Sequence, residues 1–310
     1  MMERSAKILI VGGGGITEAS LRDYLVKSGY TNVFSTSAIG LNPVIQPSVY
    51  AFFQKERPEY VFLSSTKSGG IEANIQSAGE FLYHNLESQN NVIYAAHHFG
   101  VKKLLYIAAS CIYPKGCPQP MKPEYLLTGS FEPTSEAYSI AKLAGVKLCQ
   151  TFRKQYGFKA IAVVPATLYG PGMDMNSKTA HVLGALLVKY SEAVEEGQNT
   201  VEVWGSGEPR REFLYSEDFA EGCVFLMDRY EGEEIIHLGA GEDISIKELA
   251  QQIALATGFK GKTVFNTQKP DGAYQKLLDS SVLHKMGWKP KVSLKEGIER
   301  TKNMTTGRVK

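Results

Sequence analysis

Two residues near the middle of the chain, Tyr138 and Lys142, could carry acid–base chemistry. They end the stretch Glu132-Pro-Thr-Ser-Glu-Ala-Tyr-Ser-Ile-Ala-Lys142 and stand four positions apart, a spacing that places both side chains on one face of a helix. A phenol has a pKa of about 10, and a nearby ammonium group favours its ionised form. A tyrosine held in this way can exchange a proton with a sugar hydroxyl or a ketone while a hydride moves. The same spacing also suits an ordinary amphipathic helix, so it does not by itself establish an acid–base pair.

The segments around this pair alternate between predicted strands and predicted helices. Short apolar runs that end in polar or glycine-rich loops indicate buried strands, and longer amphipathic runs indicate helices. This alternation is typical of an α/β protein with a doubly wound parallel sheet of the Rossmann type, which binds ligands beyond the carboxyl ends of its strands. We expect strands at 7–11, 32–35, 59–63, 103–109, 160–164, 200–204 and 234–238, and helices at 73–86, 90–99, 136–156, 181–190, 216–230 and 278–286.

A glycine-rich loop follows the first predicted strand. Gly12-Gly-Gly-Gly15 separates that strand from a helical pattern that begins near Ile16. In this context such a loop can cradle a pyrophosphate at the N-terminus of a helix. The spacing G-x-x-G-x-x-G would require a third glycine at position 18, where this chain has Glu18. A glycine-rich structural turn is the alternative interpretation.

The residues that usually select between NAD and NADP are missing from their expected place. A carboxylate after the second strand reads the ribose hydroxyl of NAD, whereas an arginine there accommodates the phosphate of NADP. Between Asp23 and Glu56 the chain has neither an acidic residue nor an arginine, and Thr36 and Ser37 offer only hydroxyls. The sequence alone therefore leaves the choice of dinucleotide open.

We expect the chain to form two domains. Residues 1–167 would make the dinucleotide-binding Rossmann domain, which the chain rejoins at about 216–239. Residues 168–215 and 240–310 would make a smaller, mixed α/β domain for the substrate. In the latter, Ser245-Ile-Lys-Glu248 matches a capping box and indicates the start of a further helix. The active site is then expected in the cleft between the two domains.

Composition argues against several classes of protein. With 43% hydrophobic residues, 21% charged residues and a net charge of +2, the chain has neither a basic run for nucleic acid nor an apolar stretch of the ~20 residues that a membrane span needs. Its four cysteines lack the spacing of metal ligands and favour a reducing compartment over a disulfide framework. We therefore expect a cytoplasmic protein without a metal site, a nucleic-acid partner or a membrane anchor.

Taken together, the motifs resemble the extended short-chain dehydrogenase/reductases, and within them the GDP-L-fucose synthase family. The resemblance runs over nearly the whole chain. It is carried by the Tyr138 stretch and by Ser110-Cys-Ile-Tyr-Pro-Lys115, Leu168-Tyr-Gly-Pro171, His181, Val203-Trp-Gly-Ser-Gly207, Arg211-Glu-Phe-Leu214, Pro270-Asp-Gly272 and Lys276-Leu-Leu-Asp279. It implies an NADP(H)-dependent epimerase and reductase of a GDP-4-keto-6-deoxy-hexose, with NAD as the alternative cofactor.

The resemblance also implies roles for single residues. Tyr138 would give a proton to the C4 oxygen, and Lys142 would lower the pKa of Tyr138 and hold the nicotinamide ribose. Cys111 and His181 match the pair that moves protons at C3 and C5. Such a pair makes chemical sense because a 4-keto group acidifies both neighbouring carbons, and a thiolate is accessible near a cationic partner. A buried structural cysteine and a structural histidine are the alternatives.

Ligand contacts are implied for two further groups of positions. Cofactor contacts fall on Gly12, Gly15, Ile16, Leu41, Ser64, Thr66, Lys67, Ala108, Ser110, Pro165, Thr167 and Leu168, together with Tyr138, Lys142 and His181. Substrate contacts fall on Lys189, Trp204, Arg211, Asp271 and Lys276, where the cations suit a diphosphate and the aromatic ring suits a sugar or a base. The resemblance further implies a homodimer built on the helices around 75–99 and 136–156.

The chain departs from the family pattern at functional positions. Ala109 stands where the family has a catalytic serine or threonine, and Ser110 beside it would point to the other side of a continuing strand. The remaining departures are Gly14 and Ala38 for arginines that grip NADP, Glu18 for the third glycine, Thr167 for asparagine and Lys189 for arginine. These changes affect hydride transfer and cofactor binding. They leave Cys111 and His181, the pair expected to move protons at C3 and C5, in place.

The departures leave three functions open. The first is an epimerase and reductase of a GDP-4-keto-deoxy sugar with reduced or altered cofactor use. The second is an epimerase or oxidoreductase of a related nucleotide sugar with weakened hydride transfer. The third is a relative that binds a nucleotide sugar without turnover. The first agrees with the largest number of motifs.

Overall fold

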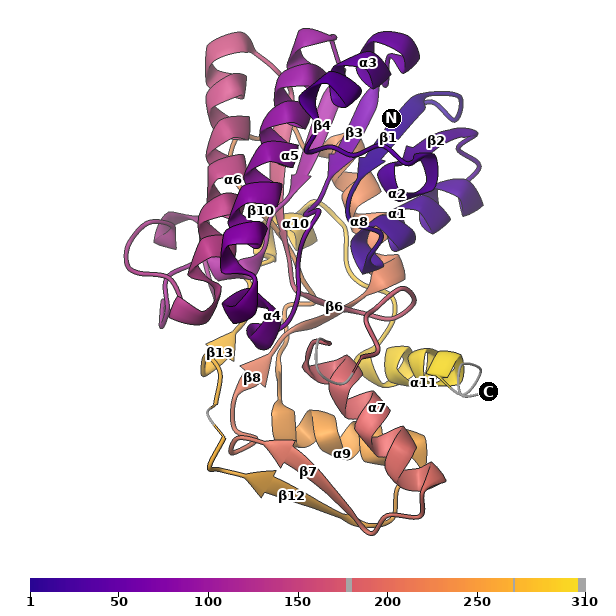
Figure 1. The fold of residues 1–310 in the computed structure, drawn as a ribbon, viewed down its shortest axis with the longest axis vertical. Helices are drawn as coiled ribbons and strands as arrows, with labels where there is room; N and C mark the ends of the chain where they lie inside the picture. Colours follow the sequence, from indigo (N-terminus) through magenta and orange to yellow (C-terminus); the bar gives the residue numbers. More distant parts are fainter. Residues whose placement is uncertain (177–179, 270, 306–310) are drawn as a thin grey trace.

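The computed structural model describes residues 1–176, 180–269 and 271–305. The chain forms a larger lobe and a smaller one (Figure 1). Each lobe contains its own buried apolar core. Among the described residues, no helix is both long enough and apolar enough to cross a membrane.

The larger lobe is built on a six-stranded sheet in the order β10-β5-β4-β3-β1-β2. Every pairing in this sheet is parallel. The central strands β4 and β5 are buried along their whole length, as expected for a sheet with helices on both faces. The predicted doubly wound α/β fold is confirmed. The strands are β1 (Lys7–Val11), β2 (Asn32–Ser35), β3 (Tyr60–Leu63), β4 (Lys103–Ile107), β5 (Ala160–Pro165) and β10 (Ile236–Leu238).

Two groups of helices flank this sheet (Figure 1). Helices α3, α5 and α6 pack together, and α1 and α8 form a separate pair. Because β10 pairs with β5, the chain returns to the large sheet after it has passed through the smaller lobe. The helices of this lobe are α1 (Ile16–Lys27), α2 (Thr36–Ile39), α3 (Gln46–Glu56), α4 (Ile71–Gln76), α5 (Ala78–His98), α6 (Glu136–Tyr156), α8 (Ser216–Arg229) and α10 (Ser281–Lys285).

Helix α5 differs from the prediction, which placed a break between residues 86 and 90. The helix is continuous because the polar residues in its middle find partners within the fold. The Ser88 hydroxyl donates to the His84 carbonyl at 2.7 Å, and the Gln89 side-chain amide donates to the Ala141 carbonyl at 2.8 Å. The polar run is therefore a buried contact with α6 and not a helix end. Strand β4 also ends at Ile107, two residues earlier than predicted.

The smaller lobe combines short strands with three longer helices. At its α9 helix, the Ser245 hydroxyl accepts the Glu248 N–H at 3.1 Å and the Glu248 carboxylate accepts the Ser245 N–H at 2.9 Å, which confirms the predicted capping box. The elements are β6 (Thr167–Tyr169), α7 (Val182–Glu195), β7 (Thr200–Trp204), β8 (Arg210–Arg211), β9 (Phe213–Tyr215), β11 (Ile244–Ser245), α9 (Ile246–Thr257), β12 (Lys262–Asn266), β13 (Gln275–Lys276) and α11 (Leu294–Thr305).

Candidate active site

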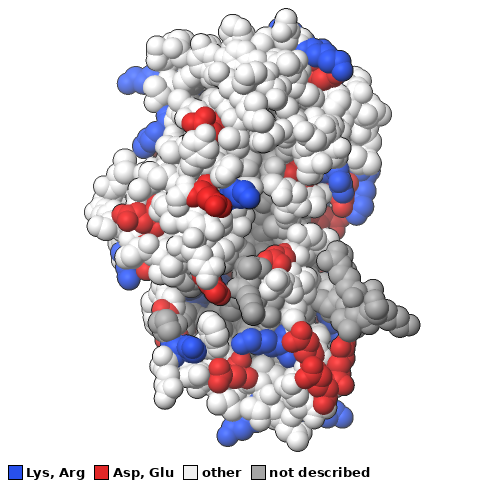
Figure 2. All heavy atoms as spheres, in the orientation of Figure 1, with Lys and Arg blue, Asp and Glu red and all other residues white. Residues whose placement is uncertain are grey.

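The residues with predicted chemistry gather at the carboxyl edge of the large sheet. Because the strands are parallel, Val11, Leu63, Ile107 and Pro165 all end at this edge. The segments that follow these strands face the smaller lobe (Figure 1). The molecular surface is recessed between the two lobes, and acidic and basic side chains lie around the recess (Figure 2).

Tyr138 and Lys142 lie in the first two turns of α6, on the face that turns toward the sheet. Lys142 is 1% exposed, and its ammonium group lies 4.2 Å from the centre of the Tyr106 ring. The Tyr106 hydroxyl in turn donates to the Gln89 side-chain oxygen at 2.6 Å. Burial lowers the pKa of Lys142 to about 7, because an ammonium group loses its hydration there. The lysine is thus held over an aromatic ring.

The Tyr138 hydroxyl has a hydrogen-bond partner that the sequence analysis missed. Its oxygen lies 2.7 Å from the Ser65 hydroxyl oxygen, in the loop that follows β3. Burial raises the pKa of Tyr138, the nearby Cys111 sulfur raises it further, and the Ser65 hydrogen bond opposes both. The run Ser64-Ser-Thr66 at the end of a predicted strand was the available signal. Only the fold shows that its middle residue faces Tyr138.

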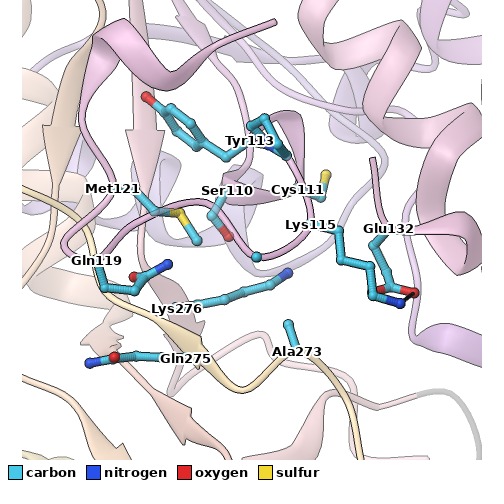
Figure 3. A pocket seen from close by; sticks show the side chains of 12 residues that line it. Ser110, Cys111, Tyr113, Lys115, Gln119, Met121, Glu132, Ala273, Gln275 and Lys276 are labelled. Carbon is cyan, nitrogen blue, oxygen red and sulfur yellow. Dashed lines mark hydrogen bonds and ion pairs between the residues drawn. The ribbon is translucent and has the colours of Figure 1, made fainter. Parts of the chain in front are cut away.

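Cys111 lies in a short 3₁₀ turn, Ser110–Ile112, just beyond β4. Burial raises the pKa of its thiol, whereas the charges of Lys276 and Lys142 lower it. Lys276 extends into the same pocket from β13 (Figure 3). The thiol therefore has a cationic neighbour on the side of the smaller lobe.

Ser110 corrects an expectation that depended on strand alternation. We expected its side chain to point away from the site if the strand continued. Because β4 ends at Ile107 and a 3₁₀ turn begins at Ser110, alternation no longer applies. Ser110 lines the pocket together with Cys111 and Lys276 (Figure 3).

His181 directly precedes α7 and is exposed. Although the residue is exposed, the protein atoms around its imidazole lower the pKa of this group, and the Lys276 charge lowers it further, while Asp174 raises it. A neutral imidazole can accept a proton at neutral pH. Lys276 thus acts electrostatically on both His181 and Cys111, and Cys111 acts on Tyr138. Cys111 and Lys276 line one pocket, and electrostatic effects link them to Tyr138 and His181.

Lys276 is held in this position by backbone pairing. Strand β13 runs parallel to β8, and the Glu212 N–H donates to the Lys276 carbonyl at 3.2 Å. The buried Glu212 carboxylate accepts the N–H groups of Gly241 at 2.8 Å and Leu278 at 2.9 Å. Burial raises the pKa of Glu212 to about 7, against the effect of these hydrogen bonds. Glu212 therefore fixes the segment that carries the lysine.

The glycine loop after β1 has the shape of a dinucleotide cradle. A Cβ atom at Gly13 would collide with the Thr66 carbonyl oxygen, and Gly14 has a φ of 79°, which favours glycine. Among the described residues, no side chain caps the start of α1, so backbone N–H groups of its first turn are open to a phosphate. The residues present fit a nicotinamide dinucleotide, whose diphosphate Gly15 and Ile16 would hold while Tyr138 and Lys142 face its nicotinamide end.

The other predicted cofactor residues lie along the same edge. Ser64 follows β3, with its N–H bonded to the Val11 carbonyl, and Ala108 follows β4, with its N–H bonded to the Val163 carbonyl. Both are buried and can offer only backbone and small side chains. The remaining positions are Gly12 after β1, Leu41 after α2, Thr66 and Lys67 after β3, Pro165 at the end of β5, and Thr167 and Leu168 in β6.

Glu18 reaches into this cradle from the first turn of α1. Although it is a carboxylate, it is only 2% exposed. One of its oxygens accepts the Gly14 N–H at 2.8 Å, and the other accepts the Ser37 N–H at 3.0 Å and the Ser37 hydroxyl at 2.5 Å. The side chain therefore joins the glycine loop to the end of β2, where the adenosine ribose of a dinucleotide would lie.

The predicted substrate residues fall into two groups. Trp204 is 60% exposed at the end of β7, with the ammonium groups of Lys189 and Lys269 5.4 Å and 4.9 Å from its ring centre. Lys269 was not predicted. Arg211 donates to the Ala273 carbonyl at 2.7 Å and thus lies beside the strand of Lys276.

Asp271 has a clear structural contact. Its carboxylate accepts the Ser206 N–H at 2.9 Å and the Ser206 hydroxyl at 2.7 Å, which holds the turn after Trp204. Among the described residues, no three His, Cys, Asp or Glu side chains converge in the manner of a metal site.

Comparisons with known proteins identify the family. Residues 8–239 match the NAD dependent epimerase/dehydratase family. The chain belongs to this family. GDP-L-fucose synthase 1 of Arabidopsis thaliana is 45% identical over 301 residues, which cover 97% of this chain and 93% of that protein. These matches confirm the predicted family and the predicted class of NAD(P)-dependent enzyme.

Solved structures of family members have the same fold. A GDP-6-OMe-4-keto-L-xylo-heptose reductase from C. jejuni superposes with a TM-score of 0.91 at 33% identity and 99% coverage of both chains. A GDP-mannoheptose C4 reductase from Campylobacter jejuni with NADP bound superposes with a TM-score of 0.88 at 35% identity, covering 99% of this chain and all of that one. The named nucleotide sugars of these family members all carry GDP.

Proposed function

We propose that this chain is an NAD(P)H-dependent epimerase and reductase of a GDP-4-keto-6-deoxy-hexose. The observation that carries the proposal is the arrangement at the carboxyl edge of the sheet, where Tyr138 and Lys142 lie on α6 and Cys111 shares a pocket with Lys276. A reductase needs Tyr138 and Lys142, and an epimerase needs Cys111 and His181. Support for the substrate comes from the relatives, which act on GDP-linked sugars and include GDP-L-fucose synthase 1 of Arabidopsis thaliana, and support for the cofactor comes from the relative with NADP bound.

Epimerisation would use Cys111 and His181 on the carbons beside the ketone. A base removes the proton from C3 or C5, and the electron pair delocalises into the 4-keto group. An acid then returns a proton to the other face of the same carbon. Neutral His181 can act as the base, and the protonated thiol of Cys111 can act as the acid, because the surroundings raise the pKa of the thiol and lower that of the imidazole. The Lys276 ammonium group would stabilise the enolate oxygen or the thiolate.

Reduction would follow at C4. A bound reduced nicotinamide dinucleotide supplies the hydride, and the Tyr138 hydroxyl donates its proton to the C4 oxygen, so that the ketone becomes an alcohol. The Ser65 hydroxyl, 2.7 Å from the Tyr138 oxygen, would stabilise the phenolate that remains. Lys142 would leave the Tyr106 ring to meet the ribose hydroxyls of the dinucleotide.

The GDP part of the substrate would bind across the smaller lobe. Trp204 offers an exposed ring for the guanine or the sugar, and Lys189 and Lys269 beside it offer charges for the diphosphate. Arg211 would hold the segment around Ala273, which leads to Lys276 in the catalytic pocket. Asp271 would act indirectly, through the turn that it holds.

We also propose that the protein forms a homodimer and works in the cytoplasm. Helices α5 and α6, which pack against each other, expose the large side chains of Tyr83, Tyr94, Ile140 and Tyr156, and a second copy could cover them. The cysteines are all free, which agrees with a reducing compartment. Sedimentation analysis of Tyr94→Glu against the unchanged chain tests the dimer, because a charge in that interface should give a monomer.

One experiment tests the proposed reaction. The protein is incubated in heavy water with GDP-4-keto-6-deoxy-mannose, with and without NADPH or NADH, while deuterium at C3 and C5 and dinucleotide oxidation are followed. We expect deuterium uptake without dinucleotide and oxidation coupled to uptake with it. Uptake without oxidation would reduce the function to an epimerase. If the nucleotide sugar binds but neither signal appears, the proposed reaction is wrong for this substrate.

A further inference from the structure

Glu18 occupies the part of the dinucleotide cradle that distinguishes NAD from NADP. It stands in the first turn of α1, where the G-x-x-G-x-x-G spacing would place a glycine. A carboxylate with only 2% exposure is costly unless its oxygens are hydrogen-bonded, and here both oxygens are. The fold therefore holds this carboxylate in a fixed place between Gly14 and Ser37.

The position of the carboxylate matches the place from which a dinucleotide-binding fold reads the adenosine ribose. That reading site lies at the carboxyl end of β2, where NAD-binding chains carry an acidic residue. The β2 segment of this chain has no acidic residue, but Ser37 directly follows it and donates to Glu18 at 2.5 Å through its hydroxyl and 3.0 Å through its N–H. Glu18, which lies on α1, thus places a carboxylate at this site in place of the acidic residue that β2 lacks.

The carboxylate retains the capacity to bind one more donor. An ionised carboxylate can accept about four hydrogen bonds, and the protein supplies donors from the Gly14 N–H, the Ser37 N–H and the Ser37 hydroxyl. A ribose hydroxyl is a donor and can complete the set. A 2′-phosphate is an anion that offers a negative charge instead, and two like charges in contact repel each other and weaken binding.

No cation from the neighbouring β2 segment offsets this repulsion. Between Lys27 and Lys55 the sequence contains neither lysine nor arginine. The position before Gly15 is itself a glycine with a φ of 79°, so it offers only backbone to a ligand. The adenosine end of the cradle is therefore acidic at its centre.

We propose that Glu18 sets the cofactor selectivity of this chain by accepting a ribose hydroxyl of NADH and weakening the hold on the 2′-phosphate of NADPH. The inference rests on the proposed function, since it concerns the dinucleotide of that reaction. The chain should bind NADH at least as tightly as NADPH and use both. The carboxylate acts at the far end of the dinucleotide from Tyr138, so it changes affinity and leaves the chemical step intact.

Direct titration of the full chain tests this proposal without turnover. NADH and NADPH carry the same fluorescent nicotinamide, so their dissociation constants can be compared by the change in its emission. We expect a dissociation constant for NADH equal to or below that for NADPH in the unchanged chain. In Glu18→Gln the ratio should shift by about tenfold in favour of NADPH, because the negative charge is gone. Glu18→Gly, which provides the glycine of the usual spacing, should shift it in the same direction.

A matched control separates local from general charge effects. Asp23→Asn removes the same charge from the same helix, but its side chain is 51% exposed and pairs with Arg22. This variant should keep the ratio of the unchanged chain. Competition by 5′-AMP and by its 2′-phosphorylated form reports on the adenosine end alone and should reproduce the order of affinities.

Two outcomes would overturn the proposal in distinguishable ways. If both dinucleotides bind but NADPH binds more than tenfold tighter to the unchanged chain, Glu18 does not select the cofactor and the proposed reaction still stands. Glu18 likewise does not select the cofactor if Glu18→Gln and Glu18→Gly fold and leave the ratio of the NADH and NADPH dissociation constants unchanged. If neither dinucleotide binds, both this inference and the reductase function fail.

Discussion

The two halves of the proposed active site differ in how many of the expected functional residues they retain. The half that faces the smaller lobe has Cys111, His181 and the shared cation Lys276, with pKa shifts that favour a thiol acid and an imidazole base. The half that faces the dinucleotide has Ala109 in place of a hydroxyl and a carboxylate in the glycine cradle. Under the proposed function, the residues for proton transfer at carbon are all present, whereas hydride transfer would depend on a group from another segment, Ser65.

The largest expected effect is the loss of proton exchange in Cys111→Ser. A hydroxyl is a far weaker acid than a thiol, so deuterium uptake at the carbon that this residue serves should fall about a hundredfold or more. Dinucleotide affinity should not change, because the thiol belongs to the other half of the site. Uptake is measured by mass spectrometry of the recovered sugar nucleotide.

Cys117→Ser provides the control for this prediction. Cys117 is a buried thiol in the following loop and belongs to the apolar core. This variant should keep deuterium uptake close to that of the unchanged chain. An equal loss in both variants would assign the effect of Cys111→Ser to packing and would remove the thiol from the proposed proton transfer.

Lys142, in the half of the site that faces the dinucleotide, should make the free energy of unfolding depend on pH. The pKa of Lys142 is about 7 in the fold and about 10.4 in an unfolded chain. Between these values the unfolded chain binds the additional proton, so the free energy of unfolding rises with pH. In Lys142→Met this contribution is absent. From pH 7 to 9 the unchanged chain should gain roughly 2 kcal/mol relative to that variant.

Urea unfolding of the two proteins without ligands measures this difference. Lys147→Met changes an exposed lysine on the same helix and should show no such trend. A constant difference between the unchanged chain and Lys142→Met across this pH range would mean that Lys142 stays charged in the fold. Lys142→Met should also lose dinucleotide oxidation while it keeps deuterium uptake, because the lysine belongs to the cofactor half.

The sequence predicted the parallel sheet because its strands are buried on both faces and read as apolar runs. It also predicted α6 to within a residue, since the helix has both an apolar stripe and a glycine, Gly157, after its end. It failed where polar side chains find partners in distant segments. The α5 break and the role of Ser65 depend on contacts with Ala141 and Tyr138, which only the folded chain brings close.

The catalytic positions were easier to predict than their surroundings. Tyr138, Lys142, Cys111 and His181 came from motifs, and their catalytic roles stay predictions. The contacts of Glu18 were not predictable, because a first-turn glutamate usually faces solvent at a helix N-terminus. Its burial depends on Ser37, which lies 19 positions away along the chain.

A smaller effect is expected from Ser65→Ala. The loss of one hydrogen bond to the Tyr138 oxygen should lower the rate of dinucleotide oxidation about tenfold and leave deuterium uptake unchanged. Ser68→Ala, at an exposed position of the same loop, is the control. If Ser65→Ala and Ser68→Ala slow oxidation equally, the hydrogen bond from Ser65 to Tyr138 does not contribute to the reaction.

The smallest effect is expected from Ala109→Ser. Its combination with Ser65→Ala tests most directly whether the hydroxyls at positions 65 and 109 serve the same oxygen. If Ser65 already supplies the hydroxyl contact of Tyr138, a second hydroxyl at position 109 should raise oxidation only a few-fold. In the background of Ser65→Ala the same change should recover most of the lost rate, since the two hydroxyls would serve one oxygen. Effects that multiply independently would show that they serve different atoms. In that case Ser65 would be a neighbour of Tyr138 and not a replacement for the missing hydroxyl.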